Sequence, residues 1–279
     1  MVLLCAVAEC VPMVGLLHEV ASEVTRVSRL VVIAGSFIGG RYNADGSAFI
    51  PFRSANASMS CARETSCYRA GYSRRFFMIK VFAHPASTCT RKVLTTLAET
   101  NTPHEFVLVD FAKGEHKATE HMARQPFGQV PTINDDGFEL YESRAIIRYI
   151  NDKASGTLVP SNPQQRALMD QWMSIETSNF TTHAMKFVYH HIFGRPQEPA
   201  VLAAADVALN VALSVMEKQL TASEYLVASG FSLADICFMP YVEYLMPTPA
   251  KEIVAKYPHV MAWWNRCSER PSWRKVAGR

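Results

Sequence analysis

Two places in the chain put a hydroxyl or thiol at the expected start of a helix, where it could hold an anion. Ser87 and Cys89 follow Pro85, just after a β-prone run, and open a helical pattern. Ser143 follows Glu142 at the start of a second helical pattern. The first backbone N–H groups of a helix have no partner within it, and they carry the positive end of the helix dipole. Ser143 and these N–H groups therefore form a ready site for a carboxylate.

The stretch just before Ser143 predicts a hairpin that could hold an extended peptide. Residues 130–133 and 138–141 are β-prone runs separated by the turn sequence Asn-Asp-Asp-Gly. Pro131 cannot donate to a ladder, so it must lie at an edge, a first position or a bend, and the Val130–Pro131 bond is a candidate for the cis form. A cis bond would turn the Val130 backbone out of the sheet, where a peptide could pair with it. Hairpin and carboxylate pocket together suit a short, acidic peptide.

The elements around these residues must bring the helix starts and the hairpin together. The order is strand, helix, strand, then strand, strand, helix, which is the thioredoxin-like arrangement. The expected elements are strands at 78–84 and 106–111, a helix opened by Ser87, an ambiguous helical piece at 118–124, the hairpin, and a helix at 143–154.

Beyond a proline-bracketed linker at 158–163, nearly all of the chain has helical periodicity. Ser232 and Asp235 stand three residues apart before an apolar run, which predicts a capping box with Asp in place of Glu or Gln. We give this pair a structural role. Helices are expected at 164–191, 199–221, 232–245 and 258–270.

The hairpin and the segment around Ser143 resemble a known family. Pro-Phe-Gly-Gln-Val-Pro at 126–131 and Tyr-Glu-Ser-Arg-Ala-Ile at 141–146 are similar to the glutathione-binding half of the cytosolic glutathione transferases, most closely the serine-type phi class. The resemblance runs from about Ile79 to the C-terminus. It implies a thioredoxin-like glutathione-binding domain at 78–157, the linker at 158–163, and an all-helical domain at 164–279 that lines a hydrophobic substrate site.

The resemblance also implies a role for each candidate residue. Ser87 matches the position from which phi-class enzymes hydrogen-bond the glutathione sulfur, although an ordinary helix N-cap would explain it too. His116 and Lys117 match the contacts to the glycine end, and on sequence alone they would be a solvated turn. Gln129 is either a turn residue or a partner of the peptide. The implied glutathione-binding set is His116, Lys117, Gln129, Val130, Pro131, Glu142 and Ser143, with Ser87 as the catalytic residue.

The helical domain should supply an apolar wall for the second substrate. The candidates are rings on the long helix after the linker, and packing in the helical core explains each of them equally well. Phe127 resembles the aromatic key that related homodimers insert into the partner subunit, with core packing as the alternative. The wall candidates are Phe180, His183, Phe187 and Tyr189.

The expected activity is conjugation of reduced glutathione to hydrophobic electrophiles in detoxification, with glutathione peroxidase activity as a further possibility. No prosthetic group or metal is expected, and glutathione is the co-substrate. One rival is glutathionyl transfer or disulfide reduction through Cys89, although Cys89, Val93 and Leu97 fall on one helical stripe that favours a buried structural cysteine. Another is a non-catalytic binding or regulatory module, because this fold also serves in translation-factor subunits and nitrogen-regulation proteins.

Charge and cysteine content limit the other possibilities. Residues 1–77 hold eight arginines, no lysine and five acids, and the remaining 20 basic and 20 acidic residues cancel. The folded part therefore has no bulk electrostatic reason to bind nucleic acid or an anionic membrane. Seven cysteines without zinc-ligand spacing fit free thiols in a reducing cytoplasm.

The segment 1–77 carries no motif that we can attach to chemistry. Its arginine-rich, acid-poor end at 63–75 is weakly similar to an organelle transit peptide. We favour a different account, in which it is a non-homologous or untranslated extension, disordered and dispensable, and the transferase-like protein begins at Met78.

Overall fold

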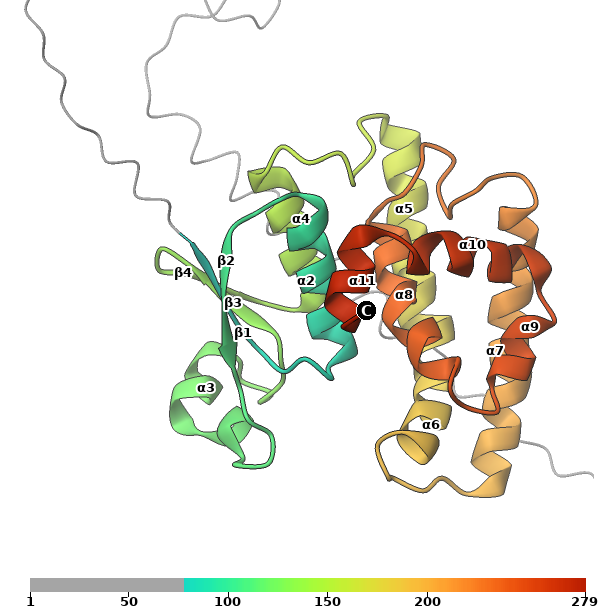
Figure 1. Cartoon of the computed structure of the whole chain (residues 1–279), viewed down its shortest axis with the longest axis horizontal. Coiled ribbons are helices and arrows are strands. Elements are labelled where there is room, and N and C mark those ends of the chain that lie inside the picture. The colour runs from blue at the N-terminus through green and yellow to red at the C-terminus, as the bar shows by residue number, and fades with distance from the viewer. Residues whose placement is uncertain (1–77) are drawn as a thin grey trace, which may run out of the picture. The chain divides into compact units, whose positions relative to one another are not determined.

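The computed structural model describes residues 78–279, and the expectations for residues 1–77 lie outside that range. The described part has a four-stranded sheet with helices packed on it, followed by a bundle of helices (Figure 1). Both expected halves, a thioredoxin-like domain and an all-helical domain, are therefore present.

The sheet contains β1 (Ile79–Ala83), β2 (His104–Leu108), β3 (Thr132–Asp135) and β4 (Phe138–Tyr141), in the order β2-β1-β3-β4. β1 runs parallel to β2 and antiparallel to β3, and β3 and β4 form the expected hairpin. Parallel neighbours need a crossover connection, which α2 (Thr88–Glu99) supplies between β1 and β2.

Two helices cover the sheet and close the first domain. α2 packs against α4 (Ser143–Lys153), and both contribute buried apolar side chains to the core. The sheet supplies Ile79, Val81 and Ile133, all at most 1% exposed. Between β2 and β3 lie the short turn η2 (Glu115–Lys117) and α3 (Thr119–Arg124), where the ambiguous helical piece was expected. The two helix starts are thus held on one rigid core.

β2 begins and ends earlier than the sequence predicted. His104 pairs with Ile79 in the β1–β2 register, whereas the prediction placed the strand start at Phe106. Pairing with β1, helped by a 3.7 Å ion pair between Lys80 and Glu105, outweighs the apolar pattern of the later residues. The strand also stops early because the Asp110 carboxylate accepts a hydrogen bond from the Ala112 N–H at 2.9 Å, which begins a turn.

The hairpin turn is shorter than the four-residue sequence suggested. Asn134 and Asp135 belong to β3, and only Asp136 and Gly137 turn, with φ of 53° and 90°. Positive φ at both central residues is the requirement of the tight hairpin turn that fits the twist of two strands. The Asn134 side chain accepts the Gly137 N–H at 3.1 Å and closes the turn.

The helical domain is built around α8 (Leu233–Leu245), whose residues are buried on nearly every side. The predicted helix at 164–191 is a continuous run in which a π segment, η3 (Glu176–Thr181), joins α5 (Pro163–Ile175) to α6 (Thr182–His191). Two short helices were not predicted, α9 (Lys251–Ala255) and α11 (Pro271–Ala277). The remaining helices are α7 (Pro199–Leu220) and α10 (Pro258–Ser268).

The capping box at the start of α8 is confirmed, and its carboxylate also bonds residues outside the first turn of the helix. The Asp235 carboxylate accepts hydrogen bonds from the Ser232 N–H at 2.9 Å and from its hydroxyl at 3.0 Å. It also accepts the Leu226 N–H at 3.0 Å and the Trp263 indole N–H at 2.8 Å. One fully buried side chain therefore ties the loop before α8 and helix α10 to the start of α8.

Candidate active site

Ser87 lies in the turn between β1 and α2, where it serves as the N-cap of α2. Its Oγ accepts a hydrogen bond from the Thr90 N–H at 3.2 Å, and its own N–H donates to the His84 carbonyl at 2.9 Å. The residue is half-buried. Because the Thr90 bond uses Oγ as an acceptor, the Ser87 hydroxyl proton remains available to donate to an anion.

The helical domain reaches this turn through one aromatic side chain. The Tyr244 hydroxyl on α8 donates to the Ala86 carbonyl at 2.8 Å, and the Arg91 guanidinium lies 4.6 Å from the centre of the Tyr244 ring. Burial raises the pKa of the Tyr244 hydroxyl above its ordinary value, against the opposing effect of Arg91, so the phenol stays a hydrogen-bond donor. The backbone next to Ser87 is therefore fixed by both domains.

Aromatic residues of the helical domain continue from Tyr244. Phe193 lies 5.5 Å from the Tyr244 ring, and Tyr189 lies 6.2 Å from Phe193, in ring-centroid distances. We call Tyr189, Phe193 and Tyr244 the aromatic wall. Tyr189 was among the predicted wall residues. Phe193 and Tyr244 were not among those candidates, because nothing in the sequence tells that Tyr244 contacts the Ser87 turn or that Phe193 contacts Tyr244.

Two other wall candidates belong to the core. Phe180 is fully buried against Phe238 and Tyr241, with ring centroids 5.0 and 6.5 Å away. Phe187 is 8% exposed. The alternative reading, core packing, therefore holds for both rings, while His183 is half-buried.

A second aromatic chain links the Ser87 turn to the His116 turn. The His84 ring stacks on Phe111 at 4.4 Å, and Phe111 meets the His116 ring edge-on at 5.0 Å. His116 Nδ1 is buried and has no hydrogen-bond partner among residues 78–279. His116 is thus a rigidly placed side chain with one ring nitrogen still to be satisfied.

Lys117 makes a contact that the sequence did not suggest. Its ammonium donates to the Phe127 carbonyl at 2.9 Å, and its stem lies over Gly128. A Cβ at Gly128 would come within 2.5 Å of the Lys117 Nζ, and φ there is 62°, so only glycine suits this position. The contact joins the His116 turn to the loop that precedes β3.

That loop ends in a cis Val130–Pro131 bond, so the expectation of a cis proline is confirmed. The Val130 backbone N–H and C=O have no hydrogen-bond partner within the described part of the chain. Two side chains of the preceding segment brace the loop: Gln125 accepts the Gln129 N–H at 3.1 Å, and His121 contacts the Gln129 carbonyl at 2.8 Å. Both are buried, at 2% and 4% exposure, and sequence reasoning missed them.

Ser143, where the sequence predicted a carboxylate pocket, lies at the start of a helix as expected. Ser143 is the first residue of α4 and is 3% exposed. The helix start, whose first N–H groups have no partner within the helix, is therefore nearly buried. Glu142 just before it has φ of 71° and ψ of 106°, an unfavourable region for a residue with a side chain. Backbone strain of this kind persists where the surrounding structure enforces it, and it is common at binding sites.

A buried charge cluster includes Arg144, the residue after Ser143. The Glu176 carboxylate, in the π segment and 0% exposed, accepts from the Lys92 ammonium at 3.2 Å and from the Arg144 guanidinium at 2.9 Å. The Thr181 hydroxyl donates to the same carboxylate, and Lys92 also donates to the Tyr241 hydroxyl at 3.0 Å. We call Lys92, Arg144, Glu176, Thr181 and Tyr241 the buried cluster. It joins α2 and α4 to the helical domain.

The cluster keeps its two cations charged. Burial lowers the pKa of Lys92, but the neighbouring Tyr241 and Glu176 outweigh it, and the pKa lies above the ordinary value. The pKa of Arg144 is raised in the same way, with Glu176 as the principal opposing charge. Burial raises the pKa of the nearby Cys237 thiol to about 12, so this thiol stays protonated.

Cys89 is half-buried on α2, and Cys89, Cys237 and Cys267 are all free thiols. Phe127, by contrast, is 62% exposed, with its ring edge-on to Tyr141 at 6.4 Å. Packing in the core therefore does not explain Phe127.

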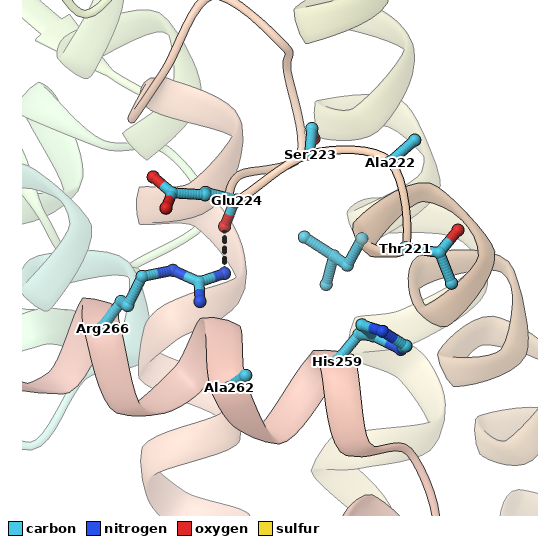
Figure 2. A pocket seen from close by; sticks show the side chains of 8 residues that line it. Thr221, Ala222, Ser223, Glu224, His259, Ala262 and Arg266 are labelled. Atoms are coloured by element: carbon cyan, nitrogen blue, oxygen red, sulfur yellow. Dashed lines mark hydrogen bonds between the residues drawn. The ribbon is translucent and has the colours of Figure 1, made fainter.

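A hollow of mixed polar and apolar lining lies between the end of α7 and α10. Its volume is about 290 Å³, and Figure 2 shows the Arg266 guanidinium directed at the Glu224 carbonyl, to which it donates at 2.6 Å. His259, which also lines the hollow, contacts the Glu217 carboxylate at 2.7 Å. None of the predicted glutathione residues lines this hollow.

Comparison with known proteins defines the class to which this fold and site belong. The family described as "Glutathione S-transferase, N-terminal domain" matches residues 78–152, and "Glutathione S-transferase, C-terminal domain" matches residues 180–271. Among solved structures, glutathione transferase F2 from Populus trichocarpa is similar with a TM-score of 0.68 and 34% identity, covering 72% of this chain and 97% of that one. Glutathione S-transferase I from maize, in complex with an atrazine glutathione conjugate, matches with a TM-score of 0.68 and 33% identity over 72% and 97% of the two chains.

Sequence relatives give the same answer. Glutathione S-transferase F6 of Arabidopsis thaliana is 38% identical over 206 residues, which are 71% of this chain and 98% of the relative. Probable glutathione S-transferase GSTF1 of Oryza sativa subsp. japonica is 37% identical over 208 residues, 71% and 95% of the two chains. The chain belongs to the glutathione S-transferase family and to its phi type, and it is a glutathione transferase enzyme.

Proposed function

We propose that Ser87 activates the sulfur of reduced glutathione and that the thiolate attacks a hydrophobic electrophile held against the aromatic wall. The peptide pairs with the Val130 backbone, its γ-glutamyl carboxylate meets the first turn of α4 at Ser143, and Glu142 receives its amine. His116, Lys117 and Gln129 bind the glycine end. The observation that carries the proposal is the Ser87 hydroxyl itself, which caps α2 with its oxygen and keeps its proton free.

The size of the effect can be estimated from the chemistry of thiols. A free thiol with a pKa of about 8.5 is only ~3% ionised at pH 7, and lowering the pKa by about two units takes ~2.7 kcal/mol of differential binding. Nucleophilicity falls as the pKa falls, with a slope of ~0.4–0.5, so ionisation alone gives a gain of only a few-fold. The larger contribution must come from holding the thiolate against the electrophile, away from water.

The helix dipole and the Ser87 hydroxyl act on the same anion. The N–H groups of the first turn of α2 carry positive partial charge toward the Ser87 turn. Tyr244 holds the Ala86 carbonyl, so the backbone beside the sulfur is fixed before the electrophile arrives. Such pre-arranged donors are worth more than flexible ones, because they need no reorganisation during the reaction.

We further propose that the enzyme acts in detoxification as a cytoplasmic homodimer. The exposed Phe127 beside the exposed Tyr141 supports a subunit contact at this edge of the thioredoxin-like domain. The three free thiols among the described residues suit a reducing compartment. In light scattering of the full-length protein, the Phe127→Ser variant should have the mass of one chain where the wild type has the mass of two. An unchanged mass would place the subunit contact elsewhere.

The central experiment is a set of three variants assayed with chlorodinitrobenzene and with an organic hydroperoxide. Ser87→Ala should lower kcat/KM for conjugation by about 10²-fold, as loss of one stabilising donor does elsewhere, while glutathione still binds. Thr88→Ala, the matched control one residue along, should stay near wild type. Strong loss in Cys89→Ser with little change in Ser87→Ala would instead favour glutathionyl transfer through Cys89. No turnover in any background, including the wild type, would favour a binding module.

A further inference from the structure

The aromatic wall carries a stacked arginine at each end. The Arg91 guanidinium lies 4.6 Å from the centre of the Tyr244 ring, and the Arg195 guanidinium lies 5.4 Å from the centre of the Tyr189 ring. Both distances fall within the ~6 Å over which a cation is attracted to the face of a ring. Phe193 contacts both tyrosines. The surface proposed for the electrophile is therefore bounded by positive charge.

The carboxylates of the described chain do not neutralise this charge. Neither arginine forms an ion pair within residues 78–279, and neither does Glu198, the acid three positions after Arg195. Glu243, the neighbour of Tyr244, is paired with Arg279 at 2.7 Å. Both guanidiniums are thus left without an anionic partner in this part of the chain.

Arg195 is held in place through its backbone and through its side chain, in the loop that joins α6 to α7 (Figure 1). Its N–H donates to the Tyr189 carbonyl at 2.8 Å, so the residue on which the guanidinium stacks also binds the backbone. Further along the loop, the Gln197 N–H donates to His190 Nδ1 at 3.0 Å, and the Gln197 side chain donates to the Arg195 carbonyl at 3.0 Å. Arg195 is exposed, but little freedom remains to be lost when a ligand binds it.

A stacked guanidinium keeps its hydrogen-bonding edge open. The contact with the ring uses the flat face, whereas the five N–H groups lie in the plane of the group. The Arg195 guanidinium donates no hydrogen bond to residues 78–279. A carboxylate or sulfonate suits such a fork, because two of its oxygens can accept two parallel N–H bonds.

The two arginines are placed for different anions. Arg91 donates through Nε to the Pro85 carbonyl at 3.2 Å, in the turn that carries Ser87, so its charge lies near the proposed thiolate. Arg195 stands two rings further along the wall. We propose that Arg195 binds a carboxylate or sulfonate of the electrophile, separated by at least an aromatic ring from the carbon that the thiolate attacks. This substrate class rests on the function proposed above.

The preference for such substrates should be moderate and sensitive to salt. A pair between exposed charges changes an equilibrium constant by up to about fivefold. Because the pair forms before the reaction and persists through it, it should lower KM for the anionic electrophile and leave kcat nearly the same. Salt at about 0.5 M should remove most of the preference, since it screens exposed charges.

The test compares two electrophiles that differ in charge alone. One is an aryl enone with an oxyacetic acid group in the para position, and the other carries an oxyacetamide there. With both, the glutathione sulfur adds to the β carbon of the enone, the C=C bond is lost, and water supplies a proton to the α carbon. The oxymethylene group insulates the enone from the acid, and the rate without enzyme corrects for any remaining difference in reactivity.

The quantity measured is kcat/KM for the acid divided by kcat/KM for the amide. In the full-length wild type this ratio should be about five at low salt. Arg195→Gln should bring it to about one by raising KM for the acid, and Arg195→Glu should bring it below one. A wild-type ratio of one or less, or the wild-type ratio in Arg195→Gln, overturns the proposal.

Lys256→Gln is the matched control. It removes an exposed positive charge from the same helical domain, and Lys256 forms no ion pair within residues 78–279. The ratio should stay at its wild-type value. A fall as large as that in Arg195→Gln would mean that the net charge of the domain sets the preference, which overturns a site at Arg195.

Arg91→Gln separates the two arginines. It should lower conjugation of both electrophiles by the same factor, so the ratio should stay near that of the wild type. A ratio lost in Arg91→Gln and kept in Arg195→Gln overturns the assignment, because the anion site would then lie at the Ser87 end of the wall.

Failure of the anion site and failure of the proposed function give different results. Conjugation of both electrophiles that survives in Ser87→Ala contradicts the role of Ser87. Loss of both in Ser87→Ala, with the wild-type ratio in Arg195→Gln, contradicts the anion site alone. The saturated, unreactive ketones of the two probes give the same ratio as dissociation constants in calorimetry, so Arg195 is tested in either case.

Discussion

Three serines stand at helix starts within residues 78–279, and they divide into two open sites and one closed one. Ser232 at α8 is 1% exposed, and the Asp235 carboxylate takes its N–H and its hydroxyl. Ser87 at α2 is half-buried and accepts a single hydrogen bond, from its own helix. Ser143 at α4 has no acidic residue in the first turn to cap it. A serine at a helix start is structural where a carboxylate of the chain closes that start, and it can bind a ligand where none does.

The closed start should give the largest loss of stability. Asp235→Ala removes the acceptor of four hydrogen bonds, and it leaves the Leu226 N–H and the Trp263 indole N–H buried without partners. Each unsatisfied group costs about 1–3 kcal/mol, so the free energy of unfolding should fall by about 4–5 kcal/mol. Urea unfolding followed by tryptophan fluorescence measures this. A loss below about 1 kcal/mol would show that Asp235 is no more than an ordinary surface cap.

The buried cluster, which includes Arg144 next to the open start at Ser143, should give the second-largest loss of stability. Glu176→Gln removes the negative charge between the Lys92 and Arg144 cations, and breaking a buried pair in this way costs about 3–5 kcal/mol. We expect about 3 kcal/mol, because Arg144 is partly exposed and can reach water. Glutathione affinity should fall as well, since Arg144 follows Ser143 directly. The double variant Glu176→Gln with Lys92→Met should recover part of the stability, and a double variant as unstable as the single one would contradict the charge explanation.

The contact between α2 and α11 should depend on pH. Burial raises the pKa of Glu99, but hydrogen bonds from Arg270 and Ser272, together with the Arg270 charge, outweigh it and hold the pKa below its ordinary value. The stability that the Glu99 carboxylate contributes is therefore fully present above the pKa of Glu99 in the unfolded chain. It is lost as the pH falls through the lower pKa that Glu99 has in the folded protein. The difference in melting temperature between wild type and Glu99→Gln should shrink between pH 6 and pH 3. A difference that does not change with pH would mean that the Glu99 charge contributes nothing.

Removal of residues 1–77 should have the smallest effect on stability and on glutathione binding. A chain that begins at Met78 should unfold within about 1 kcal/mol of the full chain and bind reduced glutathione with the same affinity. Both quantities come from urea unfolding and from calorimetric titration. A shortened chain that fails to fold would show that residues 1–77 belong to the working protein.

Features that depend on near neighbours in sequence were predictable. The Val130–Pro131 bend, the Asp136–Gly137 turn and the Ser232–Asp235 box each follow from residues within a few positions of one another. The helix start at Ser87 is of the same kind. These signals, with the family resemblance, were sufficient for the domain order and for the proposed glutathione contacts.

Features that join distant parts of the chain were not predictable. Lys92 and Glu176 are 84 positions apart, and the π segment that places Glu176 has no local signal. Tyr244 and Ala86 are 158 positions apart, so no pattern marks their hydrogen bond. The bounds predicted for β2 were wrong because pairing with β1 decides where the strand begins, whereas the prediction rested on the apolar run at 106–111.

The central claim is that Ser87 stabilises the glutathione thiolate, and the most direct measurement is the pKa of the bound thiol. Thiolate absorbance in the ultraviolet, titrated with glutathione saturating the full chain, reports it without any electrophile. We expect a pKa about two units below that of the free thiol in the wild type, returning most of the way in Ser87→Ala. A bound thiol with the same pKa in both proteins would contradict the account.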